Sequence, residues 1–143
     1  MRAFTIGYTQ KTPEEFFTLL NNPQITRVVD IRLSNNNPFA GFTKKNYLEY
    51  FLRAICNLDY IHRLDLAPTK AMFVAYKNSH DWAAYETSFL ELLRQRNINN
   101  IFTEAMVNGS CFLCSEPTPE QCHRRLVVEY LQSRWRNLEI IHL

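Results

Sequence analysis

The chain has 143 residues, of which 46% are hydrophobic and 21% charged, and its net charge is +2. This length and composition fit one α/β domain over residues 1–143. The charge excess is too small to indicate nucleic-acid binding, because an ordinary mixed-charge surface gives the same value. No apolar run reaches the ~18–20 residues that a membrane span needs, so no membrane association is expected.

The amino terminus and the cysteines are the features from which we predict the cellular compartment. Residues 1–8 reach a glycine too early to supply the apolar region of a signal peptide, so we expect a cytoplasmic location. The four cysteines are then expected to be reduced thiols rather than a disulfide framework. They are Cys56, Cys111, Cys114 and Cys122.

The first half of the chain alternates short apolar runs with amphipathic stretches, a pattern typical of βαβ units. Strands are predicted at 3–6 and 27–31, and a short one near Tyr60-Ile61. Between the first two, Thr12 can cap a helix whose capping box Glu15 completes. Thr43 is predicted to cap the next helix, whose apolar residues recur from Tyr47 to Ile55. The asparagine-rich segment 34–38 is predicted to be a loop.

The second half continues the pattern after a partly helical excursion over 62–80. A helix is expected at 82–96 and a shorter one within 98–106. The run 111–114 is predicted to be a fully buried central strand. Thr118 to Gln121 forms a second capping box, which should begin a helix reaching about Trp135. With a terminal strand at 139–143, we predict a three-layer sandwich: a mainly parallel sheet of about five strands with helices on both faces.

Asp30 and Arg32 are the first candidate site residues. They lie two apart at the end of a predicted strand and should therefore point to the same side. Ligands of open α/β sheets bind beyond the carboxyl ends of the strands, and Tyr8 follows another such end. The alternative interpretation is an Asp–Arg pair that only fixes the following loop.

The segment from Cys114 to Arg124 is the richest in chemistry. It contains Glu116, Cys122 and His123, and it runs from a buried strand to the start of a helix. Asp30, Cys114, Glu116 and Cys122 are the candidate catalytic residues; Tyr8, Arg32, His123 and Arg124 are the candidate substrate-binding residues. His123 can equally be a hydrogen-bonded core histidine, and Cys122 a small apolar side chain.

The cysteine spacing does not favour a metal site. Cys111 and Cys114 have the spacing of half a zinc site, but three residues along a strand turn the side chains to opposite faces. A site of Cys114, Cys122, His123 and Glu116 would lack a second matched ligand pair. We therefore predict no metal and no cofactor. Phosphate-binding and nucleotide-binding glycine motifs are also absent.

Taken together, these motifs resemble the domain of unknown function 488 family (DUF488). Thr5-Ile6-Gly7-Tyr8-Thr9 is similar to the opening strand and loop of that family, and Asp30-Ile31-Arg32 to its Asp-x-Arg signature. Cys114-Ser115-Glu116 and Cys122-His123-Arg124 are similar to its Cys-x-Glu and Cys-His-Arg motifs. The loop after Arg32 departs from the family pattern, since it lacks a second arginine. The resemblance implies a parallel α/β fold and no particular activity.

Three functions compete. The first is an enzyme acting on a nucleotide, a nucleic-acid base or another phosphorylated substrate, which makes an anionic small molecule or nucleic acid the expected partner. In it, Arg32 and Arg124 hold an anion near the predicted helix start. The alternatives are a non-catalytic nucleic-acid or protein binding module and a thiol- or metal-based sensor. Helix-start and arginine charges also predict that Cys122 is more acidic than Cys114.

Overall fold

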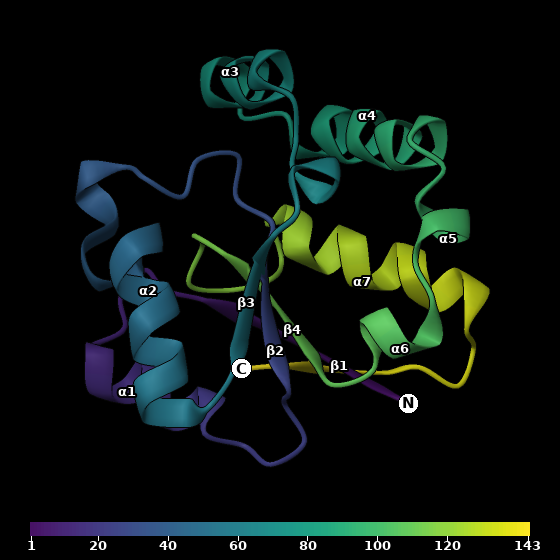
Figure 1. Ribbon diagram of the computed structural model, residues 1–143. Helices are drawn as coiled ribbons and strands as arrows, with labels where there is room; N and C mark the ends of the chain where they lie inside the picture. The colour runs from purple at the N-terminus through teal and green to yellow at the C-terminus, as the bar shows by residue number, and fades with distance from the viewer.

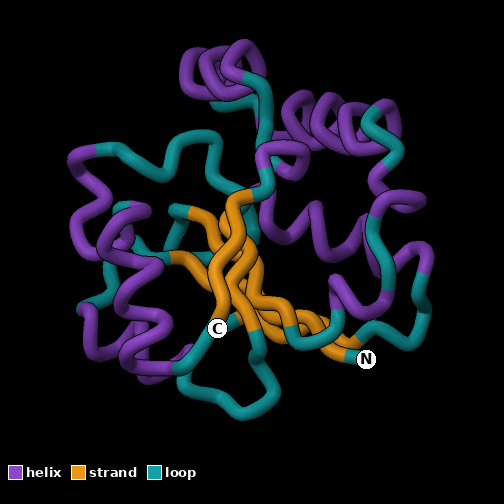
Figure 2. The backbone as a smooth tube through the Cα atoms, viewed as in Figure 1, coloured by secondary structure: helices purple, strands orange, loops and turns teal.

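The computed structural model describes residues 1–143 and is built on one five-stranded sheet. All four neighbouring pairs are parallel, in the order β3-β2-β4-β1-β5. The strands are β1 (Arg2–Gly7), β2 (Arg27–Asp30), β3 (Asp59–His62), β4 (Ser110–Cys114) and β5 (Glu139–His142). Figure 2 shows the strands running through the middle of the molecule with helices on both sides. The predicted α/β fold is confirmed.

Seven α-helices surround the sheet (Figure 1). They are α1 (Pro13–Leu20), α2 (Lys45–Phe51), α3 (Lys70–Ser79), α4 (Trp82–Gln95), α5 (Ile98–Ile101), α6 (Glu104–Val107) and α7 (His123–Arg134). Two core clusters, of 18 and 12 buried residues, bury the two faces of the sheet. The larger includes residues of α4 and α7, the smaller residues of α1 and α2. None of the helices is both long and apolar enough to cross a membrane.

Helix α3 is the least buried of the longer helices. None of its side chains is buried, and it lies at the outside of the molecule beside α4 (Figure 1). The ring of Tyr76 connects α3 to α4, where it packs against Trp82 and Tyr85. This helix occupies the stretch predicted only as a partly helical excursion. The 98–106 stretch forms two short helices, α5 and α6, instead of one.

Two predicted helix starts are wrong, and the site explains both. The Thr12 capping box of α1 is present, but Thr43 caps nothing: it is fully buried and bonded to Arg32. Helix α7 begins at His123, not near Thr118, and Cys122 is its N-cap residue. Residues 118–121 form a bend and a turn instead, and hydrogen bonds from Arg124, described below, hold the preceding loop in place.

Candidate functional site

A cavity of about 230 Å³ opens where the carboxyl ends of β1, β2 and β4 meet. Cys114, the last residue of the central strand, lies in its wall. The predicted site residues that line the cavity are Tyr8, Arg32, Cys114, Glu116, Cys122 and His123. Asp30 and Arg124 do not line it, since both are fully buried behind the wall.

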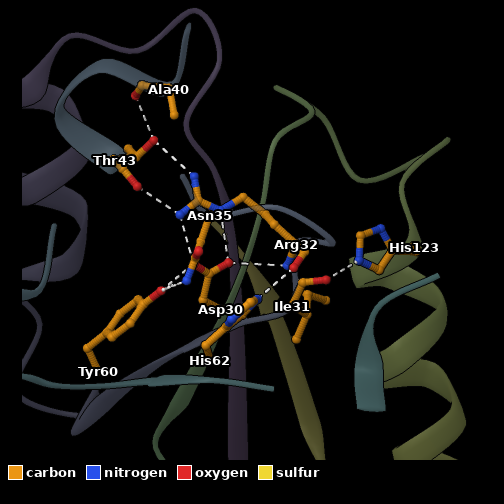
Figure 3. A network of polar contacts seen from close by, with 9 residues as sticks. All are labelled: Asp30, Ile31, Arg32, Asn35, Ala40, Thr43, Tyr60, His62 and His123. Atoms are coloured by element: carbon orange, nitrogen blue, oxygen red, sulfur yellow. Dashed lines mark hydrogen bonds and ion pairs between the residues drawn. The ribbon is translucent and has the colours of Figure 1, made fainter. Parts of the chain in front are cut away.

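Asp30 and Arg32 form a buried, two-pronged ion pair. Nε of Arg32 donates to Oδ1 of Asp30 at 2.9 Å, and Nη2 donates to Oδ2 at 2.7 Å. The other side of the guanidinium donates to the hydroxyl and the carbonyl of Thr43. Figure 3 shows this arrangement, in which the phenol of Tyr60 also donates to Asp30 at 2.6 Å. Burial and the Asp30 charge both raise the pKa of Tyr60, so it remains a hydrogen donor.

This geometry corrects the roles predicted for the pair. Asp30 has no exposed surface and accepts from Arg32 and Tyr60, so it is not placed to move a substrate proton. Arg32 is 3% exposed, and most of its donors already have protein acceptors. Removing one partner of a buried ion pair leaves an uncompensated buried charge. The stability lost is therefore larger than the net stability that the intact pair contributes. The pair therefore holds the loop after β2 in place.

Two backbone carbonyls at this pair each orient a histidine ring. The carbonyl of Ile31 lies 2.8 Å from Nε2 of His123, and the carbonyl of Arg32 lies 2.8 Å from Nε2 of His62. A carbonyl can only accept, so Nε2 carries the hydrogen in both rings. The Asp30–Arg32 pair thus acts on the site indirectly, by fixing the carbonyl that fixes His123 (Figure 3).

The His123 ring lies directly against the sulfur of Cys114. Sγ is 3.3 Å from Nδ1 and 3.9 Å from Nε2. Because both nitrogens are this close, the sulfur sits beside the ring rather than on the axis of one nitrogen's lone pair. Phe89 packs against the other part of the ring, at 5.4 Å between centroids. His123 is therefore a fixed polar neighbour of the sulfur, held between a carbonyl and an aromatic ring.

Cys114 carries the more acidic of the two thiols. Burial alone would raise the pKa of Cys114. The neighbouring Cys122 thiol, the backbone N–H groups of residues 115 and 116 and the charge of Arg124 together outweigh burial. The pKa of Cys114 consequently lies below its ordinary value.

Cys122 behaves in the opposite way. Its pKa is raised well above the ordinary value, first because the Cys114 sulfur lies within 4.8 Å and then because of burial. The prediction that Cys122 is the more acidic thiol is wrong. It rested on a first-turn position in a longer helix, whereas Cys122 is the N-cap residue of α7 and is buried beside Cys114.

Arg124 lies behind the site and braces the loop between β4 and α7. Its Nη1 donates to the carbonyl of Glu116 and lies 3.6 Å from the sulfur of Cys122, and its Nη2 reaches the carbonyl of Pro117. The side chain has no exposed surface. It is therefore not placed to hold a substrate, but it puts a fixed positive charge beside the thiol pair.

Gly7 makes this bracing possible. A Cβ at this position would lie 1.7 Å from the carbonyl oxygen of Glu116 and 2.8 Å from Nη1 of Arg124. Only glycine lets the loop and the guanidinium approach the end of β1 so closely. Glu116 itself is exposed, and its side chain lies in the cavity wall.

Cys114, Cys122 and His123 are also the residues that could surround a metal ion, since their ligand atoms lie within 4.8 Å of one another. One contact argues against that use. The guanidinium of Arg124 lies 3.6 Å from the Cys122 sulfur, where it would repel a cation. The donor set fits a thiolate better than a metal.

Aromatic side chains form part of the same cavity wall, called the aromatic wall below, and the sequence did not reveal them as part of a site. Trp82 and Tyr85 are stacked with centroids 5.2 Å apart, and Tyr76 packs edge-on to Trp82 at 5.7 Å. Phe73 of α3 also contributes. Trp82 and Tyr85 lie in the helix predicted at 82–96, which no sequence motif connected with a site. Phe73 and Tyr76 lie three apart on α3, in the stretch predicted only as a partly helical excursion.

Comparison with known proteins identifies the family. The sequence model described as "Domain of unknown function DUF488" matches residues 12–131. The chain belongs to this family, as its Asp-x-Arg, Cys-x-Glu and Cys-His-Arg motifs indicated. No curated protein matches the chain, and no solved structure matches it.

Proposed function

We propose that the chain is an enzyme in which the Cys114 thiolate attacks an electrophilic carbon of a small planar substrate, of the nucleobase or nucleoside class. The observation that carries this proposal is the position of Cys114: its thiol has a lowered pKa and lies in the wall of a cavity that aromatic side chains also line. A thiolate is the reactive form of cysteine, and acidified cysteines in accessible cavities are typical nucleophiles.

The proposed step uses residues already in place. The lone pair of the Cys114 sulfur forms a bond to the substrate carbon, and the leaving group departs with the bonding electrons. Cys122, which holds its proton tightly, donates it to the leaving group. Water then attacks the same carbon, expels the sulfur and returns a proton to Cys122, so the sum is hydrolysis. Glu116 at the cavity wall is the group placed to activate that water.

The aromatic wall supports the planar substrate class. Bases stack on aromatic side chains for about 1–3 kcal/mol each. Trp82 and Tyr76 offer ring surface here. Asn37 and Gln121 add amide groups that can form hydrogen bonds with polar substituents on the substrate ring.

Anion binding is not part of the proposal, although Arg32 and Arg124 suggested it in the sequence. Both guanidinium groups are bound to protein acceptors. The exposed charge in the wall is the carboxylate of Glu116. A neutral base or nucleoside fits this lining better than a phosphate ester does.

The test uses a chloropurine nucleoside as the electrophile. The sulfur should displace chloride and leave a covalent adduct on Cys114, detected by intact-mass and peptide mass spectrometry. Adenosine should compete with adduct formation. Cys114→Ser should form no adduct, and Cys56→Ser should react like the unmodified chain. Labelling of Cys56 at the same rate as Cys114, or labelling that adenosine leaves unchanged, would overturn the proposal.

A further inference from the structure

We propose that Cys122 is also a resolving cysteine, which forms a reversible disulfide with Cys114 when a hydroperoxide oxidises the site. This inference rests on the proposed function in one respect: it uses the same Cys114 thiolate. It adds an activity, the reduction of hydroperoxides by the thiol pair, and a switch that turns the nucleophile off.

The geometry selects one partner for Cys114. The two sulfurs lie within 4.8 Å of each other, whereas a disulfide needs about 2.05 Å. Side-chain rotation must close the remaining gap, and both side chains also line the cavity. Cys111 and Cys56 cannot substitute, because they pack in the core on the opposite face of the sheet. Cys122 is thus the sole cysteine on the side of Cys114.

The two thiols are differentiated as an attacking and a resolving thiol should be. With the two sulfurs within 4.8 Å of each other, the pKa of Cys114 is lowered and the pKa of Cys122 is raised, so Cys114 is the more easily ionised and Cys122 stays protonated. The guanidinium of Arg124, 3.6 Å from the Cys122 sulfur, is placed to stabilise the second thiolate when it forms.

The chemistry balances with a hydroperoxide as the oxidant. The Cys114 sulfur attacks the terminal peroxide oxygen; the S–O bond forms, the O–O bond breaks, and the alkoxide leaves and takes up a proton. The Cys122 sulfur then attacks the resulting sulfenic acid, so that the S–S bond forms and hydroxide leaves as water. In sum, two thiols and one hydroperoxide give a disulfide, an alcohol and water. A dithiol restores both thiols by exchange.

The experiment treats the full chain with one equivalent of hydrogen peroxide and then blocks the remaining thiols with N-ethylmaleimide. The unmodified chain should lose the mass of two hydrogen atoms and keep two blockable thiols, and a Cys114–Cys122 peptide should appear before reduction. Dithiothreitol should restore all four thiols. Cys111→Ser and Cys56→Ser should also lose the mass of two hydrogen atoms, each keeping one blockable thiol and regaining three on reduction.

One variant of Cys122 tests the resolving role, and two outcomes with the unmodified chain separate it from the proposed function. Cys122→Ser keeps a hydroxyl but cannot form a disulfide, so a sulfenic acid should accumulate on Cys114 and be captured by dimedone. If the unmodified chain reacts with the nucleoside but retains four thiols after peroxide, the resolving role is wrong and the proposed function stands. If a disulfide forms while the nucleoside labels nothing, the resolving role stands and the proposed function fails.

Discussion

Cys114 at the end of β4 and Cys122 at the start of α7 hold their sulfurs within 4.8 Å of each other, and this proximity lowers the pKa of the first thiol and raises the pKa of the second. Seven residues separate them in the chain, and Arg124 and Gly7 hold that segment in position. The acidity of the nucleophile is therefore a property of the folded loop.

Removing the Cys122 thiol should lower the reactivity of Cys114. In Cys122→Ala the pKa of Cys114 should rise, because burial still disfavours the thiolate and the neighbouring thiol that favours it is gone. A higher pKa lowers the thiolate fraction at neutral pH, so we expect alkylation of Cys114 to slow severalfold. Cys122→Ser retains a donor and should slow it much less. Equal rates in the two variants would contradict this explanation.

The Asp30–Arg32 pair should matter for stability. Asp30→Asn leaves the Arg32 charge buried without its counter-ion, which should reduce the free energy of unfolding by about 3–5 kcal/mol. Asp59→Asn breaks an exposed pair with Arg53 and should cost no more than about 1 kcal/mol. Urea unfolding of both variants measures the difference. Similar losses would show that burial of the first pair has no special effect.

Gly7 should tolerate no side chain. Gly7→Ala drives a methyl group into the carbonyl of Glu116, so we expect a loss of about 1–3 kcal/mol together with slower alkylation of Cys114. Gly41→Ala is the control: its φ of +56° brings backbone strain, but no atom lies within 4 Å of the added carbon. It should cost about 1 kcal/mol and leave the alkylation rate of Cys114 unchanged, and a fall in that rate would argue against a local effect at Gly7.

The aromatic wall should determine binding of planar ligands. Trp82→Ala removes one stacking surface, worth about 1–3 kcal/mol, and should weaken adenosine binding by about 5- to 100-fold in calorimetric titration. Phe39→Ala removes a ring that is 93% exposed and not in the cavity wall, and should leave binding unchanged. Loss of affinity in both variants, or in neither, would show that the aromatic wall does not determine binding of planar ligands.

Hydrophobic patterning predicted the sheet well because its strands are fully or half buried. The β4 run from Ser110 to Cys114 is buried at every position, as expected of a central parallel strand. Likewise the Thr12 capping box is a local motif and is present. The apparent box at Thr118 failed because contacts from Arg124, six residues further on, hold the loop out of a helix.

Part of the candidate site was predictable from the strand ends. The sequence placed Cys114, Cys122 and His123 near one strand end, and they do line one cavity. It could not show that Arg32 and Arg124 are occupied by protein acceptors, since those acceptors include the hydroxyl and carbonyl of Thr43 and other loop carbonyls. It also missed the aromatic wall, because helical spacing does not distinguish core from cavity lining.

The central claim is that Cys114 is the reactive thiolate of this site. Its most direct test is the alkylation rate of each cysteine by iodoacetamide as a function of pH, resolved by peptide mass spectrometry. We predict that Cys114 reacts fastest near neutral pH, with a midpoint below that of an ordinary thiol. Cys56 and Cys111, whose pKa values are raised by burial, should react only at higher pH. If Cys122 or Cys56 reacts faster than Cys114 at neutral pH, Cys114 is not the nucleophile and the account is wrong.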